Sequence, residues 1–220
     1  MRDIILGVND GLVSTFLLVS GVVGGGLDAT DVLLTGVAGA VAGAISMSIG
    51  EYIATKSQEE VFDAELALER HHLRDHREEE VDQLREMLAE RGLSGEDLET
   101  VVRIIDSDDD TMLNMHAALE FGIVDEERRS PYADGAFSGV LFLIGALPSV
   151  IPFAIFDDTQ TGLIAAAILS GIGLFAVGAA KTIQTRKNLW LSGAENLALG
   201  MVGGVLAYLV GSAFDALVSR

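Results

Sequence analysis

The 220-residue sequence contains no cysteine. This absence excludes disulfide bonds, thiolate metal sites and iron–sulfur clusters. Lysine is also scarce, with only Lys56, Lys181 and Lys187. The formal net charge of −19 excludes the basic surface of a nucleic-acid-binding protein, and nothing in the sequence predicts a prosthetic group.

Half of the residues are hydrophobic and the mean hydropathy is +0.41, which is rare in a soluble domain of such high charge. The two features lie in different segments. Residues 56–129 hold 23 acidic and 9 basic side chains, a net charge of −14. Two explanations of this acidity stay open: ligand carboxylates, and adaptation to a salt-rich cytoplasm, which also disfavours lysine.

Five segments are long and apolar enough to cross a bilayer, which takes about 20 residues. The sequence therefore predicts an all-α membrane protein with five transmembrane helices and a three-helix cytoplasmic domain inserted between helices 2 and 3. The predicted domains are 1–55 (helices 1 and 2), 56–131 (inserted acidic domain) and 132–220 (helices 3–5). The predicted spans are Ile4–Leu27, Val32–Thr55, Ala133–Phe156, Leu163–Ile183 and Ala194–Val218.

Basic residues predict the orientation of these spans. They gather at the N-terminus, in the insertion and in the turn before the fifth span, so the positive-inside rule places these parts in the cytoplasm and the C-terminus outside. The first apolar segment is too long for a signal-peptide core and lacks a cleavage site. We therefore expect an integral protein of a prokaryotic plasma membrane.

Asp10 lies within the first predicted span, in the run N-D-G-L-V-S-T. A charged group costs roughly 2.5–3.5 kcal/mol near a bilayer centre, so it usually faces a bundle interior or an ion path. Met47, in the second span, offers a thioether that suits a transition metal, and Glu51 follows it by one helical turn. We interpret Asp10, Met47 and Glu51 as a candidate transport pathway. The alternatives are a structural aspartate, a methionine that fills space, and an interfacial glutamate.

Two glycine pairs in the spans, Gly39 with Gly43 and Gly200 with Gly204, predict close approach of helix backbones. The partner helix belongs either to the same chain or to a second subunit, and the sequence leaves both open. Two prolines, Pro148 and Pro152, predict a kink in the third span.

The sequence of the insertion predicts three helices. The first runs from about Ser57 to Arg91 and is predicted to continue the second span without a break. The second begins after Ser94, a plausible N-cap, and the third spans about Asp109 to Phe121. The acidic run 106–110 lacks the spacing of a calcium loop and is interpreted as a solvated turn.

Carboxylates and imidazoles recur on one face of the first and third of these helices, at spacings of three and four residues. If the two faces meet, they form an oxygen and nitrogen site for Fe²⁺, Mn²⁺ or Zn²⁺. The alternative is a solvated charged surface. Gln83 continues the face but is a poor ligand. The candidate ligands are Glu65, Glu69, His72, His76, Glu79, Glu80, His116 and Glu120.

The order and spacing of several motifs resemble the vacuolar iron transporter family over essentially the whole chain. The motifs are D-G-L-V-S-T from Asp10, A-G-A-I-S-M-S-I-G-E-Y from Ala42, K-S-Q at the start of the acidic helix, E-R-G-L from Glu90, and G-A-L-P-S-V-I-P-F from Gly145.

The resemblance implies a homodimer that exports Fe²⁺ from the cytosol in exchange for protons. It implies that Asp10 and Met47 line the pathway and that Glu69, Glu80 and Glu120 are ligands. His72 and Gln83 stand where the family has glutamates, and His116 where a methionine can occur. This weakens a preference for iron over zinc or manganese.

The sequence thus predicts a transporter, not an enzyme, whose partners are divalent metal ions, protons, the bilayer and a second copy of the chain. Two other functions stay open. A membrane-anchored metal sensor or buffer would bind without transport. A di-iron ferroxidase would use the Glu-x-x-His pair at Glu69 and His72, but the chain offers only one such pair.

Overall fold

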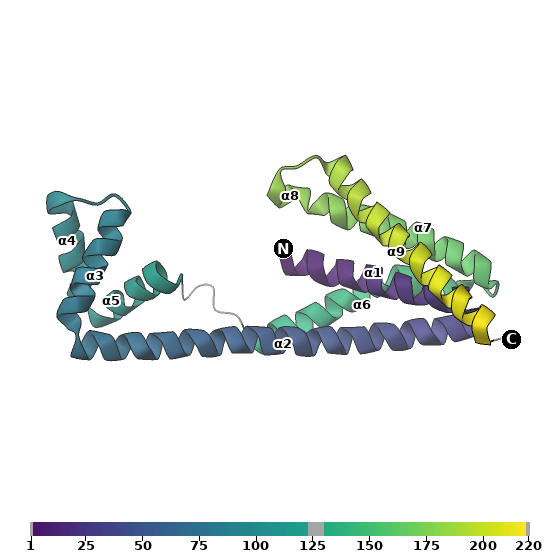
Figure 1. Ribbon diagram of the computed structural model, residues 1–220, viewed down its shortest axis with the longest axis horizontal. Helices are drawn as coiled ribbons and strands as arrows, with labels where there is room; N and C mark the ends of the chain where they lie inside the picture. The colour runs from purple at the N-terminus through teal and green to yellow at the C-terminus, as the bar shows by residue number, and fades with distance from the viewer. Residues whose placement is uncertain (1, 123–129, 219–220) are drawn as a thin grey trace. The chain divides into compact units, whose positions relative to one another are not determined.

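The computed structural model describes residues 2–122 and 130–218, and these residues form helices and connecting turns without a β-strand (Figure 1). They divide into two compact units. The first comprises residues 1–52 and 132–220, and the second comprises residues 53–131. Residues 123–129, near the end of the predicted insertion, lie outside the described part of the chain.

Five described helices are long and apolar enough to cross a membrane, which confirms the all-α membrane class. The helix of the fifth predicted span begins at Leu189, five residues earlier than expected, because the Asn188 side chain caps it by accepting hydrogen bonds from the backbone N–H groups of Trp190 and Leu191. The five helices are α1 (Arg2–Gly24), α2 (Ala29–Asp75), α6 (Pro131–Ile155), α7 (Thr159–Ala180) and α9 (Leu189–Val218), with a single turn, α8 (Thr182–Thr185), between the last two.

Glycines allow α1 and α6 to approach backbone to backbone. A Cβ atom on Gly11 would lie 2.1 Å from the carbonyl oxygen of Phe142, and one on Gly145 would lie 2.2 Å from the carbonyl oxygen of Val8. Both distances are far below van der Waals contact, so neither position accommodates a side chain. The membrane unit therefore depends on small residues where these two helices meet.

The predicted glycine pairs also contact neighbours in the same chain. A Cβ on Gly39 would lie 2.2 Å from Leu18 Cδ2, and one on Gly43 would lie 2.3 Å from the ring of Phe142. Gly200 and Gly204 likewise abut side chains of α7 and α1. Both pairs therefore pack against helices of the same chain.

Helix α2 runs without a break from the second predicted span into the insertion and ends at Asp75. The unbroken helix expected from Ser57 to Arg91 is wrong, because a bend at His76 (φ −134°, ψ 33°) separates α2 from α3 (Arg77–Glu90). In one straight helix Leu84 would lie roughly 16 Å from Leu73. The bend instead brings both leucines into one core.

This core belongs to the second unit and joins α2 and α3 with α4 (Gly95–Asp106) and α5 (Asp109–His116). A π-helical turn, Ala117–Phe121, follows α5 and ends at Gly122, whose φ of 70° favours glycine. The buried core residues are Leu73, Leu84, Leu88, Leu98, Val102, Ile105, Met112 and Leu113.

The acidic run 106–110 is ordered by specific contacts rather than being only a solvated turn. Asp108 caps α5, because its carboxylate accepts hydrogen bonds from the backbone N–H and the hydroxyl of Thr111. Asp106 and Asp109 both accept hydrogen bonds from the guanidinium of Arg77, at the start of α3. These contacts fix the first turn of α3 against the start of α5.

Candidate metal sites

A buried cluster of acids and a histidine lies in the second unit. Glu69 on α2 is 3% exposed, Glu80 on α3 is 7% exposed, and His116 at the end of α5 is fully buried. His116 Nδ1 lies 3.2 Å from Glu69 Oε1 and 3.6 Å from Glu80 Oε2. Three helices that are separate in sequence thus converge on one imidazole.

The cluster leaves buried polar atoms without hydrogen-bond partners among the described residues. These atoms are Glu69 Oε1, Glu80 Oε2 and both ring nitrogens of His116. A buried polar group without a partner costs about 1–3 kcal/mol, and a charged group costs more. A cation bound among these atoms would satisfy several of them at once, so the donor set fits a divalent metal.

Glu120 completes a triad of candidate ligands. One ligand atom each from Glu69, His116 and Glu120 can be chosen so that all lie within 4.8 Å of one another. Glu120 is exposed and lies in the π-helical turn directly after α5. Such turns are rare and often occur at functional sites, and here the turn carries a carboxylate beside His116.

The environment shifts the proton affinities of two members of this cluster. Burial and, to a smaller extent, the negative charges of Glu80 and Glu120 together raise the pKa of Glu69 to about 7. Burial lowers the pKa of His116, although the same two carboxylates oppose that shift. Near neutral pH, the site therefore offers a neutral imidazole, and a metal ion would displace a proton from Glu69.

The other predicted ligands lie around this cluster rather than in it. His72 Nδ1 is 3.6 Å from Glu80 Oε1, so it borders the site. Glu65 is half-buried on α2, one turn before Glu69. His76 and Glu79 form an exposed pair, 3.7 Å apart, at the bend between α2 and α3. The bend therefore separates residues that a straight helix would have aligned.

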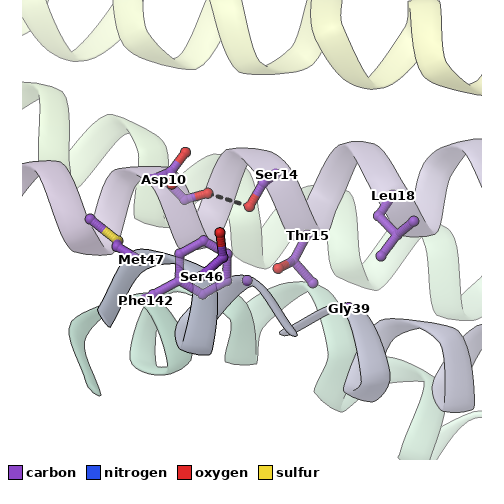
Figure 2. A pocket seen from close by; sticks show the side chains of 9 residues that line it. Asp10, Ser14, Thr15, Leu18, Gly39, Ser46, Met47 and Phe142 are labelled. Atoms are coloured by element: carbon purple, nitrogen blue, oxygen red, sulfur yellow. Dashed lines mark hydrogen bonds between the residues drawn. The ribbon is translucent and has the colours of Figure 1, made fainter. Parts of the chain in front are cut away.

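A second candidate site lies in the membrane unit. Asp10, Ser14 and Thr15 of α1 and Ser46 and Met47 of α2 line an open cavity of about 340 Å³, together with Phe142 of α6 (Figure 2). The Ser14 hydroxyl donates a hydrogen bond to the Asp10 carbonyl oxygen at 2.6 Å. Leu18, Gly39 and Gly43 complete the lining.

This cavity brings together two of the three residues predicted for the pathway. Asp10 and Met47 share it, whereas Glu51 does not line it and lies half-buried one turn farther along α2. The cavity thus combines a carboxylate, a thioether and three hydroxyl groups between apolar helices. A hard and a soft ligand side by side suit a partly hydrated transition-metal ion.

Two asparagines beside this site were not among the residues predicted from the sequence. Asn196 of α9 donates hydrogen bonds to the Asn9 side chain at 2.8 Å and to the Leu174 carbonyl oxygen of α7 at 2.7 Å. Asn9 directly precedes Asp10, so this bridge positions the turn of α1 that carries the carboxylate. Both residues carry polar amides inside predicted apolar spans, and this feature of the sequence could have identified them as candidates for contacts between helices.

Comparisons with known proteins indicate the family that the chain resembles. The model of the VIT family matches residues 1–212. The chain is 26% identical to vacuolar iron transporter 1 of Arabidopsis thaliana over 208 residues, which cover 94% of this chain and 83% of that protein. It is 33% identical to the vacuolar iron transporter of Acanthamoeba castellanii over 187 residues, which cover 81% and 68% respectively. Vacuolar iron transporter 1 of Tulipa gesneriana is 27% identical over 216 residues, which cover 98% and 87%.

Proposed function

The chain belongs to the VIT family, and from this premise we propose that it is a transporter that exports Fe²⁺ from the cytoplasm in exchange for protons. The curated relatives carry the name of iron transporters, which supports a transporter rather than an enzyme. The observation that carries the proposal is the shared cavity of Asp10 and Met47 between helices long enough to span a membrane.

In this proposal the two candidate sites act in sequence. The inserted unit is cytoplasmic and collects the ion at Glu69, Glu80, His116 and Glu120. Asp10 and Met47 then pass the ion across the membrane. Protons compete with metal for the same carboxylates, so a proton gradient directed inward favours release on the far side. Mn²⁺ and Zn²⁺ fit the same oxygen and nitrogen ligands.

We further propose that the protein is a homodimer of a prokaryotic plasma membrane, with its N-terminus inside and its C-terminus outside. The distribution of basic residues supports this orientation. The cavity beside Asp10 is open in the single chain, and Asp10 itself is exposed. A second subunit would enclose it, which accords with the high cost of a carboxylate exposed to lipid.

Transport in reconstituted vesicles tests the proposal. Vesicles with an imposed pH gradient and external Fe²⁺ should accumulate the ion when they contain the wild-type protein. We expect Asp10→Asn to abolish this uptake, because the amide cannot exchange a proton for a cation, and Met47→Leu to reduce it. Asp215→Asn is the matched control, because Asp215 also lies on an apolar helix but does not line the cavity.

The buried cluster of the inserted unit also fits a membrane-anchored metal sensor or buffer. That function predicts wild-type metal binding without any uptake, and indifference to Asp10→Asn. Full uptake by the Asp10→Asn protein would contradict a role for Asp10. Oxygen-dependent oxidation of Fe²⁺ by the purified chain would instead favour the ferroxidase.

A further inference from the structure

An apolar groove follows the contact between α7 and α9, on residues that the proposed transport does not use. Two neighbouring cavities of about 620 and 220 Å³ share Ala167 of α7 and Met201 of α9, so they form one continuous groove. Its lining runs from Phe175 to Leu163 on α7 and from Leu197 to Leu209 on α9, and Phe16 and Ser20 of α1 line the smaller cavity. The two helices lie side by side in Figure 1.

The length of this groove matches one hydrocarbon chain. Twelve residues separate the ends of its lining on each helix, which corresponds to roughly 18 Å at 1.5 Å per residue. One leaflet of a bilayer has a hydrocarbon depth of about 15 Å. An extended acyl chain of ordinary length therefore fills the groove from end to end.

The end of the groove at Phe175 carries aromatic and positive side chains. The Trp190 ring packs on the Phe175 ring with centroids 5.6 Å apart, and Trp190 is 72% exposed, as expected for tryptophan at a membrane interface. Lys181, Arg186 and Lys187 lie between α7 and α9 and are exposed. These residues supply the positive charge at this end.

The charge of this end contrasts with the rest of the protein. No acidic residue occurs between Asp158 and Glu195, although the chain carries 33 acids and 14 bases. Glu195 and the lining residue Leu197 are two positions apart on α9, so they lie on opposite faces of that helix. The groove therefore ends beside Arg186 and Lys187, and its lining on α9 contains no carboxylate.

From this combination we propose that the groove is a binding site for an anionic phospholipid. One acyl chain lies along α7 and α9, and the phosphate contacts Arg186 and Lys187, beside Trp190. A second copy of the chain fits less well, because a two-fold axis along the membrane normal would bring the two positive ends together. The inference is independent of the transported ion.

Lipid binding to the purified full-length chain tests the proposal. The protein in detergent micelles is titrated with phosphatidylglycerol or with phosphatidylcholine of the same acyl chains, and bound lipids are counted by native mass spectrometry. We expect one phosphatidylglycerol to bind at least about tenfold more tightly than phosphatidylcholine, because each nearby cation favours an anionic headgroup.

Two variants separate the contributions of charge and groove. Arg186→Gln with Lys187→Gln should remove the preference for phosphatidylglycerol, whereas Arg103→Gln, an exposed charge on α4, should leave it unchanged. Ala167→Phe should displace the bound lipid by filling the groove. Ala198→Phe, on an exposed position of α9 outside the groove, should not.

Equal binding of the two lipids would overturn the proposal, as would a preference that survives the double substitution. Retention of the lipid by the Ala167→Phe protein would overturn it as well. Cross-linking between copies through cysteines placed at Ile168 and Ile172 would show instead that a second subunit covers the groove. Each variant is checked for a monodisperse size-exclusion profile, so that a folding defect is distinguished from loss of the site.

Discussion

The two units of this chain solve the problem of helix packing in different ways. In the membrane unit, α1 and α6 meet at Gly11 and Gly145, where backbone touches backbone. In the inserted unit, α3 and α4 meet through large side chains such as Leu84 and Val102. Water drives apolar side chains together only in the second case. Between helices surrounded by lipid, close van der Waals contact stabilises the helix pair instead.

The polar sites of the two units differ in burial and in the number of nearby charges. The inserted unit buries Glu69 and His116 in the company of other carboxylates, so their proton affinities shift. The cavity at Asp10 is open, and hydroxyl groups rather than further acids surround it. A buried cluster suits tight collection of an ion, whereas an open and less charged cavity suits passage.

The largest effect is expected from filling a backbone contact in the membrane unit. Gly11→Leu should prevent folding, because the new side chain would collide with the Phe142 carbonyl group, which belongs to the backbone and cannot move aside. The yield of monodisperse protein in size-exclusion chromatography measures this. Gly50→Leu is the control, because a Cβ there meets nothing within 4 Å, and its yield should equal the wild type. A normal yield for Gly11→Leu would refute the contrast between the units.

A truncation in the core of the inserted unit should have a smaller, measurable effect. Leu84→Ala removes a fully buried side chain and should cost about 3 kcal/mol of local stability. Hydrogen exchange of α3 and α4 amides in the full-length protein reports this loss. The comparison is Leu68→Ala, whose side chain is 52% exposed, and an equal loss there would count against a core at Leu84.

The stability of the metal-free inserted unit should fall as pH rises. The pKa of Glu69 is about 7 in the folded chain against 4.5 ordinarily, so the folded state binds more protons than the unfolded state between these values. Stability is therefore full below pH 4.5 and declines through pH 7, by about 1–3 kcal/mol in all. Hydrogen exchange at pH values across this window measures the decline.

The Glu69→Gln variant sharpens this test. The amide cannot ionise, so the decline attributable to this residue should disappear, whereas the exposed substitution Glu86→Gln should leave it intact. In the wild-type protein, Mn²⁺ or Zn²⁺ should bind more tightly as pH rises through 7, because the ion displaces a proton. Metal binding that is independent of pH would contradict the buried cluster as the ligand site.

The smallest effect is expected at the hydrogen-bonded bridge of the membrane unit. Asn196→Leu removes the hydrogen bonds to Asn9 and to the Leu174 carbonyl group and should cost about 1 kcal/mol, because such bonds in membranes are weak. A thermal-unfolding assay compares it with Ala198→Leu at an exposed position. If Asn196 positions Asp10, Fe²⁺ uptake should fall by more than this loss of stability explains.

Much of the membrane unit could be predicted from the sequence, because long apolar runs leave little choice but helices. Asp10 and Met47 were predicted for one pathway from their ligand chemistry and from the resemblance. Their shared cavity could not be derived from periodicity, which does not tell which faces of two helices meet. The bend at His76 could not be predicted either. No glycine or proline lies at this position. The bend is favoured because it lets Leu84 and Leu73, which are far apart along a straight helix, share one core. Glu80 reaches His116 because of that bend, not because of its spacing from Glu69.

The surplus of acids in residues 56–129 has a consequence beyond the ligands themselves. The local enrichment of an ion in a negative potential is a Boltzmann factor, which depends exponentially on the charge of the ion. Divalent cations are therefore enriched around this segment by the square of the factor that applies to potassium. Such an ion atmosphere raises the frequency of encounters with the buried cluster before any coordination bond forms. Monovalent salt compresses the atmosphere to within about 8 Å at physiological ionic strength. Capture kinetics should therefore slow with added salt, even where the equilibrium affinity of the cluster is unchanged.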